Sequence, residues 1–131
     1  IITKSGPKVI EFNCRFGDPE TQVVLPILDG DFLDLLYSAA SGNFNSNAVK
    51  HSGGCSVCVV ASSKGYPDNY EKGFVINGLE KIDDEAIVYH AGTKREADKI
   101  LTNGGRVLGI TSVLKSFDLK LDITSFTSIS G

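Results

Sequence analysis

Three polar side chains, Glu11, Asn13 and Arg15, alternate along a stretch that is otherwise largely apolar. Alternate residues of a β-strand point to one side of a sheet, so a strand here would place the three side chains in a row. Carboxylate and amide oxygens can bind Mg²⁺, which also keeps water and binds substrate phosphates. A guanidinium beside them can donate two hydrogen bonds to a phosphoryl group. The row suits phosphoryl transfer, where positioning and charge neutralisation dominate catalysis.

The residues around this row predict the strand that would carry it. Residues 7–16 alternate, and the side opposite the polar row is apolar and predicted to face a core: Ile10, Phe12, Cys14 and Phe16. In this chain by itself we expect exposed apolar surface at Phe12, Phe16 and Val23, where more protein would pack. The alternative is that the polar row is the solvated face of an edge strand.

A turn and a helix start follow the predicted strand. Gly17 allows the turn. Asp18-Pro19-Glu20 is typical of a helix start, with Asp18 as the N-cap and Pro19 at the first helical position. The free backbone N–H groups of such a start can bind an anion. Pro26 predicts that this helix is short.

A second helix precedes a change in character. Apolar residues recur at helical spacing within 32–40, after Asp31, and Gly42 stands where a C-terminal cap belongs. Residues 43–54 are polar and predict a boundary. Beyond it lie four candidate strands, at 55–61, 73–77, 86–91 and 106–114. Because no long helical pattern separates these strands, they favour a small, mostly antiparallel sheet and an α+β fold.

Composition limits the possible functions. The 131 residues are 41% hydrophobic and carry a net charge of −3, which favours neither a nucleic-acid nor a membrane partner. The sequence contains no Met, and we therefore expect a piece of a longer protein. Three cysteines without a secretory signal favour reduced thiols in the cytoplasm. Cys55 and Cys58 have CxxC spacing, but on a strand they would point to opposite faces, so we expect two separate, partly buried thiols.

Other polar groups are weaker candidates. His51 and His90 are predicted to be structural or surface residues, and the acidic residues 83–85 to form a solvated turn. Gly104-Gly105-Arg106 resembles a phosphate-binding loop only superficially, because a strand rather than a helix follows it.

The run GPKVIEFNCRFGDPETQ, residues 6–22, closely resembles the signature of the phosphoribosylamine–glycine ligase family. Shorter matches follow in the family's order over almost the whole chain: 24–26, 65–67, 72–73, 90–93 and 104–109. The resemblance implies that residues 1–46 end an ATP-grasp core, as a strand and two helices, and that residues 47–131 form a small, mostly antiparallel C-terminal domain. The parts that bind adenine would lie in the missing N-terminal part of the same chain.

The resemblance also implies a reaction and a set of site residues. Such a ligase uses ATP to activate glycine as glycyl phosphate, which phosphoribosylamine attacks, giving glycinamide ribonucleotide, ADP and phosphate in purine biosynthesis. Glu11 and Asn13 match the ligands of Mg²⁺ or Mn²⁺. Arg15 matches an arginine beside the transferred phosphoryl group and is assigned a catalytic role with Asp18, while Arg15 and Gly17 are assigned to nucleotide binding. The chain alone is expected to be inactive.

Two alternatives remain at this stage. One is another ATP-grasp carboxylate–amine ligase or carboxylase, since an acid-x-Asn-x-Arg strand recurs among those enzymes. The other is a non-catalytic, β-rich interaction module. The continuation through residues 17–21 favours the glycine ligase, and the polar row argues against the module. Residues 117–122 are expected to open a final helix, and residues 123–131 depart from the family pattern.

Overall fold

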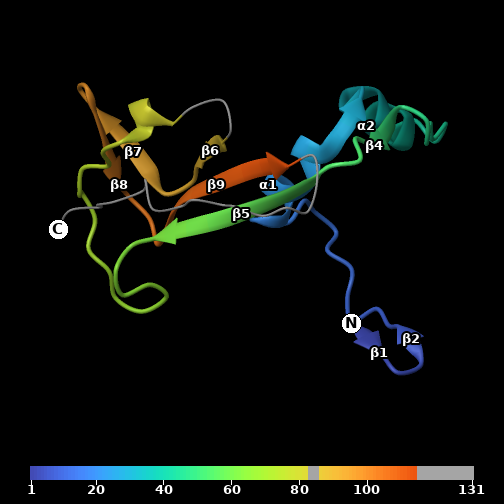
Figure 1. The fold of residues 1–131 in the computed structure, drawn as a ribbon, viewed down its shortest axis with the longest axis horizontal. Coiled ribbons are helices and arrows are strands. Elements are labelled where there is room, and N and C mark those ends of the chain that lie inside the picture. Colours follow the sequence, from blue (N-terminus) through green and yellow to red (C-terminus); the bar gives the residue numbers. More distant parts are fainter. Residues whose placement is uncertain (83–85, 115–131) are drawn as a thin grey trace.

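A three-stranded antiparallel sheet, in the order β5-β9-β6, forms the centre of the structure (Figure 1). The structure is a computed structural model that describes residues 1–82 and 86–114. The long strands β5 (Cys55–Ser62) and β9 (Arg106–Leu114) pair from Cys55↔Leu114 to Ser62↔Arg106, and β6 (Ala86–His90) lies on the other side of β9. Three of the four predicted strands and their antiparallel arrangement are confirmed, as is the α+β class.

Strands β7 (Thr93–Glu96) and β8 (Lys99–Thr102) form an antiparallel hairpin, which is a second, two-stranded sheet between β6 and β9 in the sequence. The strand predicted at 73–77 forms only in part. Val75↔Leu101 is an isolated antiparallel bridge, and backbone hydrogen bonds join Gly73, Phe74 and Ile76 to β8, but the segment is not a continuous strand. Its apolar residues mark a core segment instead, since Ile76 is buried.

The core is small and lies under the central sheet. Val107 is fully buried, and Leu108 and Ile76 are nearly so. Half-buried apolar side chains pack around these three residues: Ala61, Leu79, Val88, Ile100 and Ile110. Burial of apolar area is the main stabilising term for such a sheet.

The helices lie before the sheet in the sequence. Helix α1 (Glu20–Val24) continues into the 3-10 turn η1 (Leu25–Ile27), which contains Pro26 and confirms a short helix. Helix α2 (Phe32–Ala40) begins as predicted, because Asp31 Oδ1 accepts a hydrogen bond from the Asp34 backbone N–H at 2.9 Å. Gly42, just beyond the end of α2, has a φ of +78°, which explains why glycine stands there. None of the helices in the described residues has the length and hydropathy of a membrane span.

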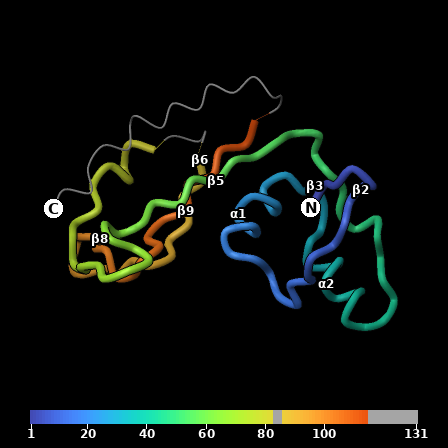
Figure 2. The backbone as a smooth tube through the Cα atoms, turned by 90° about the horizontal axis from the view of Figure 1, so that it is seen from below, coloured from blue at the N-terminus to red at the C-terminus, as the bar shows by residue number. Residues whose placement is uncertain are grey.

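Two short strands join the helical region to the start of the sheet. Strand β3 (Leu28–Gly30) pairs antiparallel with β4 (Val49–His51), which directly precedes β5. Figure 2 shows α1 and α2 grouped with the N-terminal segment on one side, and β8 and β9 on the other.

The N-terminal segment differs from the prediction. Only β1 (Ile2–Thr3) and β2 (Gly6–Pro7) form strands, as a hairpin that projects from the rest in Figure 1, and residues 8–16 are irregular. The predicted strand at 7–16 is therefore wrong for this chain beyond its first residues. Pro7 and Lys8 pair with Ile2 and Ile1, whereas residues 9–16 have no strand beside them within the described residues. Phe12 and Phe16 are 82% and 58% exposed, as expected for the chain by itself, whereas Val23, expected to be exposed with them, is half-buried in α1. The expected turn at 83–85 and helix at 117–122 lie outside the described residues.

Candidate functional site

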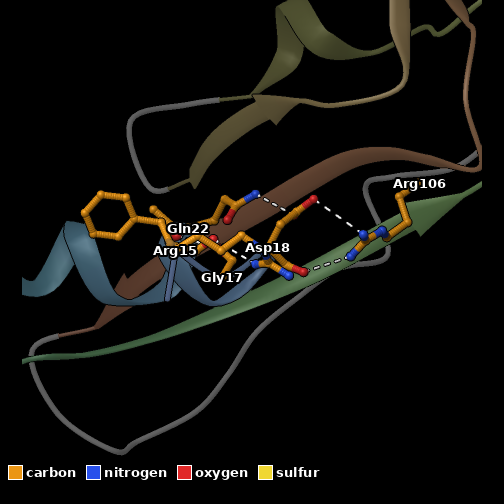
Figure 3. A network of polar contacts seen from close by, with 7 residues as sticks. Arg15, Gly17, Asp18, Gln22 and Arg106 are labelled. Atoms are coloured by element: carbon orange, nitrogen blue, oxygen red, sulfur yellow. Dashed lines mark hydrogen bonds and ion pairs between the residues drawn. The ribbon is translucent and has the colours of Figure 1, made fainter. Parts of the chain in front are cut away.

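The predicted site residues fall into two groups in the structure. Glu11 and Asn13 lie exposed on the irregular segment, so the row predicted from strand alternation is not formed. Arg15, Gly17 and Asp18 come together where the chain turns into α1 (Figure 3). This turn is the part of the predicted site that the structure organises.

The turn is fixed locally by backbone contacts. The Gly17 carbonyl accepts hydrogen bonds from the Thr21 backbone N–H at 3.0 Å and from the Thr21 hydroxyl. A Cβ atom at Gly17 would lie 2.3 Å from Glu20 Oε2, so a side chain there would displace the Glu20 carboxylate. Arg15 Nη1 donates to the carbonyl of Phe16 at 2.9 Å. These contacts tie Gly17 to the first turn of α1 and hold the Arg15 guanidinium against the backbone of the same turn.

Asp18 does not cap the helix as predicted. The residue before α1 is Pro19, and no side chain caps the helix there. The Asp18 carboxylate binds other side chains instead: Oδ1 accepts from Gln22 Nε2 at 3.0 Å, and Oδ2 lies 3.5 Å from Arg106 Nη2. The carboxylate is thus directed toward Gln22 and Arg106 and not toward the backbone N–H groups of the first turn.

Arg106 is the site residue that sequence reasoning missed. It lies at the start of β9, 88 positions beyond Asp18, and its Nη1 donates to the Asp18 backbone carbonyl at 2.9 Å. Figure 3 shows the guanidinium reaching from the sheet to the backbone carbonyl oxygen and one carboxylate oxygen of Asp18. The available signal was the pair of glycines directly before Arg106 at the start of the strand. Nothing in the sequence shows that Asp18 is the partner of Arg106.

The other end of α1 is held by hydroxyl groups of the sheet. Thr111 Oγ1, from β9, donates to the Gln22 carbonyl at 3.0 Å, and Ser56 Oγ, from β5, donates to the Val23 carbonyl. Carbonyls at a helix C-terminus lack partners within the helix and need such donors. Gly109 lies on the same side of β9, and a Cβ there would lie 4.0 Å from Gln22 Cγ. The sheet therefore holds α1 at both ends.

The glycine-rich matches have a steric explanation. A Cβ at Gly105 would lie 2.1 Å from Tyr66 Cδ2, so the Tyr66 ring occupies the space beside Gly105. A Cβ at Gly92 would lie 2.6 Å from the Cα of Gly104. These close approaches bring the loop 65–67 and the turn 91–92 against residues 104–106.

An open pocket of about 200 Å³ adjoins the turn. Its lining is mostly apolar and comes from the turn, α1, η1, β3 and the start of α2: Arg15, Phe16, Gly17, Glu20, Thr21, Val24, Leu25, Leu28 and Phe32. The Phe16 and Phe32 rings lie 5.8 Å apart, which is typical of an aromatic pair. Arg15 and Glu20 are the only charged residues among those lining it.

The remaining candidates are structural. His90 Nδ1 lies 3.0 Å from the Thr93 hydroxyl, and His51 Nδ1 accepts from the Gly53 N–H at 3.0 Å. Strand β5 alternates, so Cys55 and Cys58 lie on opposite faces, as expected. Within the described residues, no three His, Cys, Asp or Glu side chains gather as a metal site. The carboxylate and amide oxygens of Glu11 and Asn13 fit a hard cation that takes its other ligands from water and phosphate.

The fold and the anchored turn define an α+β protein whose sheet holds a loop with the residue types of a phosphoryl-transfer site. Comparison with known proteins identifies the class. Residues 56–120 match the family model "Phosphoribosylglycinamide synthetase, C domain". The phosphoribosylamine–glycine ligase of Caldanaerobacter subterraneus is 50% identical over 117 residues, which cover 89% of this chain and 28% of that protein.

Two further similarities agree with this match. The "Trifunctional purine biosynthetic protein adenosine-3" of Gallus gallus is 44% identical over 86% of this chain and 12% of its own length. The crystal structure of phosphoribosylamine–glycine ligase from Thermotoga maritima matches with a TM-score of 0.73 and 31% identity, over 89% of this chain and 28% of that one. The chain belongs to the phosphoribosylamine–glycine ligase family, and spans about a quarter of the length of the single-function relatives it matches.

Proposed function

We propose that this chain is the part of a phosphoribosylamine–glycine ligase that faces the transferred phosphoryl group, together with the C-terminal domain. The observation that carries the proposal is the 50% identity to a ligase of that name over 89% of the chain. The reaction would move the γ-phosphoryl group of ATP to a glycine carboxylate oxygen, giving glycyl phosphate and ADP. The amine of phosphoribosylamine would then attack the carbonyl carbon, releasing phosphate and a proton and forming glycinamide ribonucleotide.

Each site residue has a chemical role in this proposal. Glu11 and Asn13 hold Mg²⁺ or Mn²⁺, whose charge offsets that of the phosphates. Arg15 donates hydrogen bonds to the phosphoryl group as it moves, and Gly17 belongs to the turn that binds the nucleotide. Asp18, for which a catalytic role was expected, acts in this proposal by keeping the turn on the sheet through its contacts with Gln22 and Arg106.

The rest of the site would come from elsewhere in a longer chain. In this proposal residues 1–46 complete an ATP-grasp core and residues 47–131 form the C-terminal domain, while an upstream part supplies the adenine pocket. The exposed Ile10, Phe12 and Phe16 would then pack against that upstream part. The cytoplasm, where purine precursors are made, is the expected location.

The test is ligation by the full-length protein. With ATP, Mg²⁺, glycine and phosphoribosylamine, we expect glycinamide ribonucleotide, ADP and phosphate in equal amounts. Arg15→Ala should lower kcat by roughly a hundredfold or more, as removal of a preorganised donor does, with little change in melting temperature. Arg15→Lys should recover only part of the rate, because an ammonium cannot donate the paired hydrogen bonds of a guanidinium.

Two results would contradict the proposal. If bicarbonate or another carboxylate replaced glycine with higher kcat/KM, the protein would be a different carboxylate–amine ligase or a carboxylase. A stable and fully active Arg15→Ala variant would remove Arg15 from the phosphoryl site.

A further inference from the structure

Arg106 stands on a part of the sheet whose backbone is held from two sides. Ser63, just after β5, donates from its backbone N–H to the Gly105 carbonyl and from its hydroxyl to the Gly104 carbonyl, both at 2.8 Å. On the other side, the Gly92 N–H donates to the Arg106 carbonyl at 2.9 Å.

Close steric contacts reinforce these hydrogen bonds. A Cβ at Gly92 would lie 2.5 Å from the Arg106 carbonyl oxygen, so these two backbones are in contact. Ser63 is 6% exposed and Val107, the residue after Arg106, is fully buried. The backbone from which the Arg106 side chain extends is therefore held in place by its neighbours on both sides.

The contact that Arg106 makes is suited to positioning rather than to folding stability. Its side chain is 40% exposed and that of Asp18 is 54% exposed, and ion pairs between exposed side chains contribute little to stability. The guanidinium nevertheless reaches two oxygens of one residue, the Asp18 carbonyl and carboxylate, which fixes direction as well as distance.

Because Asp18 belongs to the same turn as Arg15 and Gly17, its contacts with Arg106 also restrict the position of that turn. Asp18 lies one residue after Gly17 and three after Arg15, in the turn that adjoins the pocket. Its second carboxylate oxygen is held by Gln22 Nε2, so the side chain is fixed from both α1 and β9. A shift of Asp18 would move Arg15 and Gly17 with it.

We infer that Arg106 is a positioning residue: from the C-terminal sheet it holds the Arg15–Asp18 turn in the geometry that phosphoryl transfer requires. This inference rests on the proposed function for its catalytic consequence, but the ordering of the turn can be measured without activity. Misplacement by about 1 Å of groups that act on a transition state can cost roughly a hundredfold in rate.

The experiment compares Arg106→Ala, Arg106→Lys and Arg95→Ala in the full-length ligase. Arg95, on β7, is an exposed arginine of the same domain and is the matched control. For Arg106→Ala we expect a kcat lower by roughly tenfold to a hundredfold, with KM for glycine and melting temperature close to those of Arg95→Ala. Arg106→Lys should recover part of kcat, because one ammonium can reach one of the two Asp18 oxygens.

Hydrogen exchange of residues 15–24 supplies the readout that does not depend on activity. The Thr21 and Gln22 amides donate to Gly17 and Pro19 carbonyls, and they should exchange faster in Arg106→Ala than in Arg95→Ala. Equal kcat in the two alanine variants, or equal exchange of this segment, overturns the inference. If Arg106→Ala does not fold, Arg106→Lys decides the matter. A kcat and an exchange rate equal to those of the wild type overturn the inference, whereas a lower kcat together with faster exchange supports it. If the wild-type protein does not ligate glycine, the proposed function fails, whereas the exchange comparison still decides whether Arg106 orders the turn.

Discussion

The contact between Gly105 and the Tyr66 ring allows a sharp test of packing at the base of Arg106. In Gly105→Ala, the new Cβ would lie 2.1 Å from Tyr66 Cδ2, whereas carbon atoms in favourable contact lie about 3.5 Å apart. The ring must therefore move by about 1.4 Å. It is 41% exposed and can turn outward, at the expense of its edge contact with Tyr70, where the ring centroids are 6.1 Å apart. We expect Gly105→Ala to lower the free energy of unfolding by about 1–2 kcal/mol.

A double-mutant cycle with Tyr66→Ala isolates this clash. The φ of Gly105 lies outside the left-handed region, so alanine is not strained there once the ring is removed. Alanine also restricts the unfolded chain, which favours the folded state by about 0.4–1 kcal/mol. In the Tyr66→Ala background, Gly105→Ala should therefore be neutral or stabilising. Urea unfolding of the 131-residue chain, followed by circular dichroism, measures all four variants. An equal loss in both backgrounds would refute the steric explanation.

Two further predictions concern the anchor of α1 and the metal site. Thr111→Val keeps the shape of a fully buried side chain but leaves the Gln22 carbonyl without its donor. We therefore expect the free energy of unfolding in urea to fall by about 1–3 kcal/mol. Thr93→Val removes a surface hydroxyl beside His90; it is the control, and it should lower the free energy of unfolding by less. Glu11→Gln in the full-length ligase should abolish Mg²⁺-dependent turnover, because it removes a carboxylate ligand. It should leave the melting temperature unchanged, because the side chain is exposed in this chain. Normal turnover at saturating Mg²⁺ would contradict a ligand role for Glu11.

The sequence predicted the elements whose residues interact locally. The cap of α2 was predictable because Asp31 and Asp34 contact each other within one turn. The long strands were predictable because their apolar residues are continuous. The hairpin β7–β8 was missed because both strands are only four residues long, β7 is mostly charged, and β8 has only two apolar residues, Ile100 and Leu101. The segment 73–77 was predicted from its apolar residues, of which Ile76 packs in the core, but it pairs with β8 only over a short, irregular stretch.

The candidate site was predictable only in part, for a related reason. Residue types and spacing pointed to the Arg15–Asp18 turn, which the structure does organise. The strand expected before it requires a pairing partner, and alternation in one segment says nothing about whether that partner lies in the same 131 residues. The partner of Asp18 was equally hidden. Asp18 was expected to cap its own helix, a local interaction, whereas its carboxylate binds Arg106 from a strand far along the chain.

Helix α1 shows why this distant contact matters. The helix has five residues, none of them buried, and a helix of that length is not stable in water without tertiary contacts. Its place is set by the sheet: Arg106 holds the residue that leads into it, and Thr111 and Ser56 hold its last carbonyls. Since the Arg15–Asp18 turn is continuous with α1, the geometry of the turn depends on strands β5 and β9. In the proposed ligase the sheet would therefore position the phosphoryl-transfer turn without contributing a group that touches a substrate, and changes on β9 should lower kcat before they weaken substrate binding.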